Sequence, residues 1–165
     1  MKQDISDVSL DTIWQILDTI TDPEIPVVSL VEMGIVRDVV LNEDGVTVTI
    51  TPTFAGCPAL TVMREDIIKR LSERGLGPVH VQTVLHPPWT SDWISDTART
   101  KLEGFGLAPP AQHSGNITLM LDETVACPHC GSKRTGLKNT FGSTLCRMIY
   151  TCDDCQEPFE RLKAI

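Results

Sequence analysis

The chain has 165 residues, of which 41% are hydrophobic and 22% are charged, and its formal net charge is −8. This composition is that of a globular protein of one or two small domains, which excludes a disordered or low-complexity chain. The acidic balance argues against nucleic-acid binding. No segment has the ~20 consecutive apolar residues of a membrane helix.

The chain divides into two parts by charge and by cysteine content. Residues 127–165 carry six basic and four acidic side chains and five of the six cysteines, so the remaining residues carry a net charge of −10. We therefore predict a first domain over 1–107, a linker over 108–126 and a small second domain over 127–165. The first 15 residues contain three aspartates and no apolar core, unlike a signal or transit peptide, so we expect a cytoplasmic location.

The first part of the chain predicts the element order αββαβα. Apolar residues at helical spacing indicate a helix over 9–20, with Ser9 as its N-cap. Alternating valine and threonine indicate strands over 35–40 and 46–51, joined by a turn at 42–45. The first domain is therefore expected to be a small α+β domain.

Cys57 and Pro58 precede the second predicted helix, which ends at Gly75. Proline is favoured at the first position of a helix, which would make Cys57 the N-cap. The positive end of the helix dipole stabilises thiolates. This placement predicts a reactive or metal-binding thiol at Cys57, and a buried structural cysteine is the alternative.

A third strand over 79–85 and a third helix over 96–104 complete this domain. Asp22 and Glu24 lie in the proline-containing turn after the first helix, where their carboxylates would either approach Cys57 or stabilise the turn. A Cys–His catalytic pair with Cys57 is also open, but the spacing selects no partner among the candidate histidines, His80, His86 and His113.

Two Cys-x-x-Cys turns dominate the second part of the chain. The cysteine pairs are Cys127 with Cys130 and Cys152 with Cys155. Two such turns place four thiolates around one tetrahedral ion, and the intervening residues suit a β-hairpin. We predict a zinc ribbon with structural Zn²⁺, because so few apolar residues cannot form a self-sufficient core. An iron–sulfur cluster is the second choice, and free or disulfide-bonded cysteines are the third.

The fifth cysteine of this region, Cys146, falls in a predicted strand over 144–151. Six extended residues span ~20 Å, which is too far for Cys146 to share an ion with Cys152. We interpret Cys146 as a small buried residue on the inner face of that strand. His129 lies inside the first turn and is expected to face solvent, because four thiolates already complete the coordination shell.

Several motifs resemble known families. The segments 22–26, 30–36 and 51–58 (DPEIP, LVEMGIV and TPTFAGCP) resemble the domain of SufT-type iron–sulfur targeting proteins. The segments PPWTSDW, GLAPP, CPHC, FGSTLC and CQEPF further along the chain resemble the PaaD family, the accessory subunits of bacterial phenylacetyl-CoA epoxidase. This second resemblance spans nearly the whole chain.

The resemblance implies a non-catalytic maturation factor for the multicomponent phenylacetyl-CoA oxygenase in aerobic phenylacetate degradation. It implies a transient iron or iron–sulfur ligand at Cys57, with Asp22 and Glu24 beside it. The implied partners are the reductase or di-iron component of the oxygenase, or an iron–sulfur donor. A homodimer would be one source of a second cluster ligand. A pure scaffold subunit and an enzyme with Cys57 as nucleophile are the alternatives.

Overall fold

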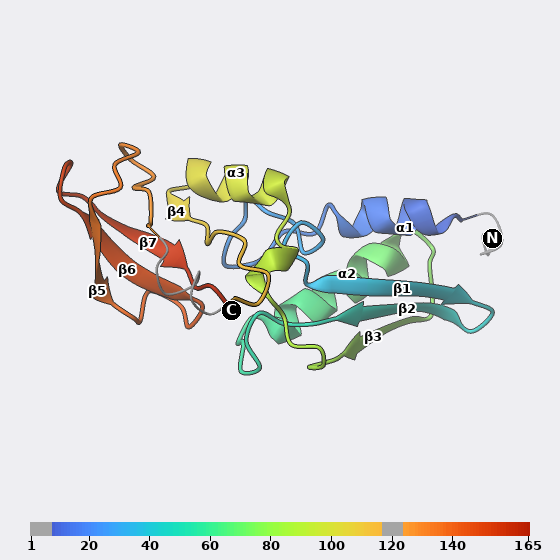
Figure 1. Cartoon of the computed structure of the whole chain (residues 1–165). Coiled ribbons are helices and arrows are strands. Elements are labelled where there is room, and N and C mark those ends of the chain that lie inside the picture. Colours follow the sequence, from blue (N-terminus) through green and yellow to red (C-terminus); the bar gives the residue numbers. More distant parts are fainter. Residues whose placement is uncertain (1–7, 117–123) are drawn as a thin grey trace. The chain divides into compact units, whose positions relative to one another are not determined.

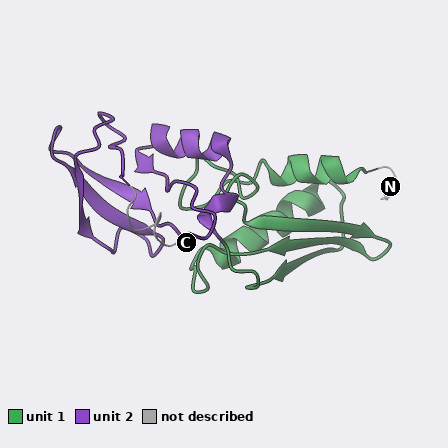
Figure 2. Ribbon diagram, viewed as in Figure 1, with its two compact units in different colours: residues 1–89 green, residues 90–165 purple. Residues whose placement is uncertain are grey.

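The computed structural model describes residues 8–116 and 124–165. The chain forms two compact units, residues 1–89 and residues 90–165, coloured separately in Figure 2. The element order along the chain begins with the predicted αββαβα, and the fold is of the α+β class. In the described part of the chain, no helix combines the length and apolar character that crossing a membrane requires.

The first unit contains a three-stranded sheet of order β1-β2-β3 (Figure 1). β1 (Val36–Asn42) and β2 (Gly45–Ile50) are antiparallel and joined by the predicted tight turn. β3 (Val79–Thr83) pairs with β2 in parallel. A parallel pair needs a crossover connection, and α2 (Leu60–Glu73) supplies it, which explains why a helix lies between these two strands in the sequence.

Two helices pack against this sheet. α1 (Leu10–Leu17) contacts β1 and α2, and α2 (Leu60–Glu73) contacts β3. Ser9 caps α1 as predicted, since its Oγ accepts from the backbone N–H of Thr12. The helices and the inner face of the sheet form an apolar core of fully buried side chains that includes Ile13, Leu17, Val48, Ile50, Ile67 and Leu71.

The start of α2 differs from the prediction. Its N-cap is Ala59 and the helix begins at Leu60, so Cys57 is not the N-cap and Pro58 is not the first helical residue. The carbonyl of Cys57 instead accepts from the N–H of Leu60 at 3.2 Å, which closes a separate turn before the helix. The thiol therefore lies in the loop that precedes the helix.

The second unit begins with a 3₁₀ turn, η2 (Ser91–Trp93), and with α3 (Asp96–Gly104), which Ser95 caps. A four-stranded sheet of order β4-β7-β6-β5 follows. Its strands are β4 (Leu107–Ala108), β5 (Thr135–Asn139), β6 (Arg147–Cys152) and β7 (Pro158–Leu162).

The hairpin of β5 and β6 agrees with the predicted ribbon, whereas β4 and β7 were not predicted. β7 is antiparallel to β6, and the ring of Phe159 stacks on Tyr150 with centroids 5.7 Å apart. β4 pairs in parallel with β7. The two compact units divide between residues 89 and 90, so β4 belongs to the second unit. Residues 117–123 of the predicted linker lie outside the described residues.

Candidate metal centre

The four cysteines of the two Cys-x-x-Cys turns lie together at one end of the ribbon. Their Sγ atoms are all within 4.8 Å of one another. The Sγ atoms of Cys127 and Cys155 are 3.7 Å apart, and those of Cys130 and Cys152 are 3.6 Å apart. A tetrahedral zinc ion with bonds of ~2.3 Å needs sulfur atoms about 3.8 Å apart. The donor set and its spacing therefore fit a tetrahedral metal ion.

The two turns have matching backbone hydrogen bonds. In the first, the N–H of Gly131 donates to the carbonyl of Cys127, and in the second the N–H of Gln156 donates to the carbonyl of Cys152. Gly131 has φ +75° and Gln156 has φ +63°. Each turn thus closes through a left-handed residue that directly follows its second cysteine. Glycine supplies this conformation without strain at Gly131.

A polar clamp joins the two turns. The guanidinium of Arg134 and the hydroxyl of Ser132 both donate to the carboxylate of Asp154. The backbone N–H of Asp153 also donates to the carbonyl of Arg134 at 2.8 Å. This clamp was not predicted. Its partners are some 20 residues apart in the sequence, and exposed charged residues of these types carry no pattern that would pair them.

The electrostatics of the cluster favour a bound cation. The backbone N–H of Cys155 lowers the pKa of the Cys152 thiol. The backbone N–H of Glu157 also lowers the pKa of Cys155, but desolvation and the three neighbouring thiols outweigh it and raise that pKa to about 12. Metal binding requires deprotonated thiolates, and a central cation relieves the repulsion between them.

The core of this unit is built around the cluster. Its buried residues are Ala108, Val125, Cys127, Cys152 and Phe159, with Tyr150 and Cys155 packed against them. Two metal ligands therefore belong to the small apolar core itself. The packing of this core therefore depends on the positions of the clustered cysteines.

Cys146 and His129 lie apart from the four-cysteine cluster. Cys146 is half-buried in the turn before β6 and not in an extended strand as predicted, because the N–H of Gly142 donates to the carbonyl of Arg147 and closes that turn. The hydroxyl of Thr144 is 3.1 Å from the Cys146 sulfur. His129 is exposed, as expected.

Cys57 lies in the first unit, on a loop that leads from β2 to α2. Its thiol is half-buried, and its N–H donates to the carbonyl of Phe54 at 3.0 Å. The Phe54 ring lies over Gly56, where an added Cβ would be 3.5 Å from Cε1. Residues 45–63 contain no charged side chain. The thiol is thus held by a defined turn in an uncharged segment of an acidic chain.

The carboxylate of Asp22 is buried and stabilises the turn after α1. Its Oδ1 accepts from the N–H of Glu24 at 2.7 Å and from the N–H of Ile25 at 3.0 Å. Glu24 is half-buried. Among the described residues, the four-cysteine cluster is the only close group of three or more potential metal donors. Asp22, Glu24 and Cys57 therefore do not form a second such group.

His113 is held within the second unit. Its Nδ1 accepts from the N–H of Gly115 at 3.0 Å, which leaves the ring proton on Nε2, 3.3 Å from Ser91 Oγ and 3.2 Å from Ile165 O. Although Asp92 Oδ2 is 3.7 Å from Nδ1, this is not a catalytic triad. In this tautomer Nε2 cannot accept a proton from the buried Ser91 hydroxyl.

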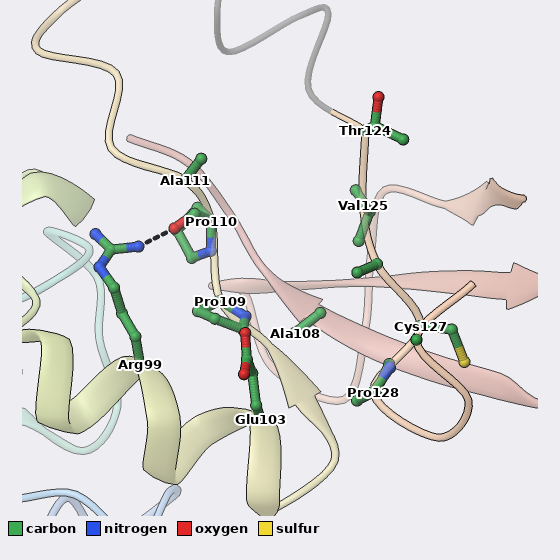
Figure 3. A pocket seen from close by; sticks show the side chains of 12 residues that line it. Arg99, Glu103, Ala108, Pro109, Pro110, Ala111, Thr124, Val125, Cys127 and Pro128 are labelled. Atoms are coloured by element: carbon green, nitrogen blue, oxygen red, sulfur yellow. Dashed lines mark hydrogen bonds between the residues drawn. The ribbon is translucent and has the colours of Figure 1, made fainter. Parts of the chain in front are cut away.

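A pocket of about 480 Å³ lies beside the first cysteine turn (Figure 3). Arg99 and Glu103 line it from α3, together with Pro109, Pro110 and Pro128. The Arg99 guanidinium donates to the carbonyl of Pro110 and, at 2.7 Å, to that of Ser91. Burial lowers the pKa of Arg99, although Asp92 and Asp96 oppose this effect. Arg99 thus ties α3 to the segment that follows β4.

Comparison with known proteins agrees with this two-part architecture. Residues 111–163 match the family described as the PaaD zinc beta ribbon domain, and residues 10–84 match the iron–sulfur cluster assembly protein family. The chain is 42% identical to an Escherichia coli K12 protein that is named as a subunit of a "Putative 1,2-phenylacetyl-CoA epoxidase", over 93% of this chain and 92% of that protein. The chain belongs to the PaaD family. Its four-cysteine ribbon is the metal-binding part of this PaaD architecture.

Other relatives match about half of this PaaD-family chain. The iron–sulfur protein maturation auxiliary factor YitW from Bacillus subtilis is 35% identical, over 56% of this chain and 91% of the factor. A crystal structure of a DUF59 domain from Bacillus anthracis matches 56% of this chain and 89% of that chain, with 30% identity and a TM-score of 0.53. The resemblance stated from the sequence motifs is confirmed.

Proposed function

We propose that this protein is an accessory maturation factor for a phenylacetyl-CoA epoxidase, in which Cys57 transiently binds iron or an iron–sulfur cluster on its way to an epoxidase subunit. The resident metal is Zn²⁺ in the four-cysteine cluster, where it stabilises the ribbon and takes no part in the transfer. The observation that carries the proposal is the half-buried Cys57 thiol on its uncharged loop. This loop lies in the unit that matches the iron–sulfur assembly family.

The names of the relatives support each half of this function. The relative that matches nearly the whole chain is named as an epoxidase subunit, and the relatives that match the first half are named as iron–sulfur maturation factors. A chain that joins both parts is suited to bring an assembly function to one particular oxygenase. These names also favour an accessory role over catalysis by the chain itself.

The chemistry at Cys57 is a ligand exchange. The Cys57 thiolate replaces a ligand of the donor on an iron atom of the cargo, and a ligand of the client then replaces Cys57, so no electrons are transferred. One thiolate holds a cluster weakly, because clusters are normally bound by four protein ligands. Weak binding suits a step in which the cargo must leave. The further ligands during transfer come from the donor, the client or a second copy of the chain.

The experiment is complementation of a strain that lacks the native gene. We expect Cys57→Ser to reduce both epoxidase activity and the iron content of the purified epoxidase to the level of the deletion strain. Cys146→Ser is the matched control, because Cys146 is also half-buried but lies outside the four-cysteine cluster. Both variants should keep one zinc per chain. Normal epoxidase activity with Cys57→Ser would overturn the proposal and favour a scaffold role.

A further inference from the structure

The turn between β5 and β6 displays an exposed aromatic ring. Phe141 is 65% exposed, the largest exposed fraction of any large hydrophobic side chain among the described residues, and Leu145 in the same turn is 47% exposed. Single exposed apolar side chains are common and need no explanation. This turn is different, because it is held rigidly in place.

Several hydrogen bonds fix the backbone of this turn. Gly142 N–H donates to the carbonyl of Arg147 at 2.9 Å, and Arg147 N–H donates to the carbonyl of Thr144 at 3.1 Å. The carboxylate of Glu160 accepts from the N–H of Ser143 at 2.6 Å and from its hydroxyl at 3.0 Å. Arg147 in turn donates to Glu160 at 2.9 Å. A turn fixed in this way loses little conformational freedom when it binds.

Close packing makes the conformation specific to glycine at one position. A Cβ added at Gly142 would lie 2.9 Å from the Cβ of Arg147 and 2.9 Å from Oε1 of Glu160. Contacts this short essentially require atoms to move. The sequence Phe-Gly-Ser-Thr thus specifies one shape of the turn.

A lysine holds the exposed ring and sets the charge around it. The Nζ atom of Lys163 is 5.3 Å from the centroid of the Phe141 ring and donates to the carbonyl of Leu145 at 2.7 Å. Such a cation–π contact restrains the ring. The nearby carboxylate of Glu160 is neutralised by Arg147. The charge beside the Phe141 ring is therefore the positive charge of Lys163.

We propose that Phe141, Leu145 and Lys163 form a docking surface for an epoxidase subunit that presents an apolar pocket bordered by carboxylates. The choice of an epoxidase subunit rests on the proposed function. Aromatic side chains are enriched at the core of protein interfaces, and a charge beside them favours partners of opposite sign. A nucleic-acid strand is disfavoured, because such strands need several stacking rings and a basic groove, whereas the chain is acidic and the turn offers one ring.

The test measures binding of the full-length chain to each purified epoxidase subunit by calorimetry. We expect one subunit to bind the wild type, and Phe141→Ala to weaken that binding about tenfold or more. Lys163→Glu should also weaken it and reduce its dependence on salt. Phe105→Ala is the matched control, because Phe105 is 45% exposed in the same unit but outside the docking surface. Retention of one zinc per chain shows that each variant folds.

Three results would overturn the docking proposal. The first is unchanged binding in both Phe141→Ala and Lys163→Glu, and the second is the absence of binding by every subunit. The third is that Phe141→Ala weakens binding of a single-stranded oligonucleotide, or self-association of this chain, and leaves binding of the subunit unchanged. Cys57→Ser separates the two proposals, since it should bind the subunit normally but fail to support epoxidase activity. If Cys57→Ser binds the subunit and also supports normal epoxidase activity, the docking proposal holds and the proposed transfer through Cys57 is wrong.

Discussion

The two units of this protein use cysteine in opposite ways. The first unit has a large apolar core of two helices on a sheet, and its single cysteine is half-buried on a loop outside that core. The second unit has a small core in which two of the four clustered cysteines are themselves buried members. The first unit thus keeps its cysteine outside the core, whereas in the second unit cysteines take the place of apolar core residues.

Metal removal should have the largest effect, because it should unfold the ribbon and leave the first unit folded. Chelation of zinc, or Cys152→Ala, is expected to unfold the ribbon, because structural zinc contributes on the order of 10 kcal/mol to such small domains. Amide NMR should show collapse of the signals of residues 124–165, while signals of the first unit persist. Cys146→Ser serves as the control and should keep both sets of signals. A ribbon that stays folded without metal would contradict our description of its core.

Truncation of the apolar core should have the converse effect. Leu71 is fully buried on α2, and Leu71→Ala is expected to destabilise the first unit by about 2–5 kcal/mol through loss of buried contacts and creation of a cavity. Chemical denaturation followed by fluorescence or NMR measures this loss. Ile68→Ala on the same helix, where the side chain is 38% exposed, should cost much less. Equal losses in the two variants would contradict the assigned core.

The cysteine turns should depend on backbone conformation at Gly131. An added Cβ at Gly131 meets no atom within 4 Å, but φ is +75°, so Gly131→Ala should cost about 1 kcal/mol from backbone strain alone. Zinc affinity, measured by competition with a chelator, should fall about fivefold to tenfold. Gly136→Ala is the control, because a Cβ there also meets nothing and φ is not positive. An equal effect of both substitutions would exclude backbone strain as the cause.

The smallest effect concerns the pH dependence of the Phe141 turn. Desolvation raises the pKa of Glu160, but the hydrogen bonds from Ser143 and Arg147 outweigh it and lower that pKa below its ordinary value of 4.5. A carboxyl with a lowered folded-state pKa stabilises the fold above its unfolded pKa, and this contribution disappears as the pH falls through the folded pKa. The amide shift of Ser143 should therefore titrate with a midpoint below 4.5. The titration should be absent in Glu160→Gln, and a midpoint above 4.5 would contradict the hydrogen bonding described.

Features encoded by short stretches of sequence could be predicted. The cap at Ser9, the alternation in β2 and the end of α2 before Gly75 each depend on a few neighbouring residues, and all agree with the structure. The spacing within each Cys-x-x-Cys turn likewise brings its two thiols together locally. That the two turns meet was predictable because the second domain has too few apolar residues to form a core without a shared metal ion.

Features that depend on distant partners could not be predicted. β7 begins with a proline and has no clear alternation, and it forms because Phe159 stacks on Tyr150 across the sheet. β4 consists of two residues and exists only through its pairing with β7. The predicted start of α2 was wrong for a local reason. Proline is accepted in the turn that precedes a helix as well as at the first helical position, and Pro58 lies in such a turn. Gln156 could have been found by analogy with Gly131, because each residue directly follows a Cys-x-x-Cys motif.

The division of labour between Cys57 and the four-cysteine cluster can be tested directly by metal analysis. Wild type and Cys57→Ser would be purified without oxygen, brought to equilibrium by dialysis against ferrous iron and sulfide, and analysed for zinc, for iron in excess of the protein-free compartment and for visible absorption. We predict one zinc per chain in both proteins, with iron and visible absorption in the wild type alone. Iron that persists in Cys57→Ser would place a cluster in the four-cysteine site and contradict the zinc assignment. The absence of iron from both proteins would contradict Cys57 as its ligand.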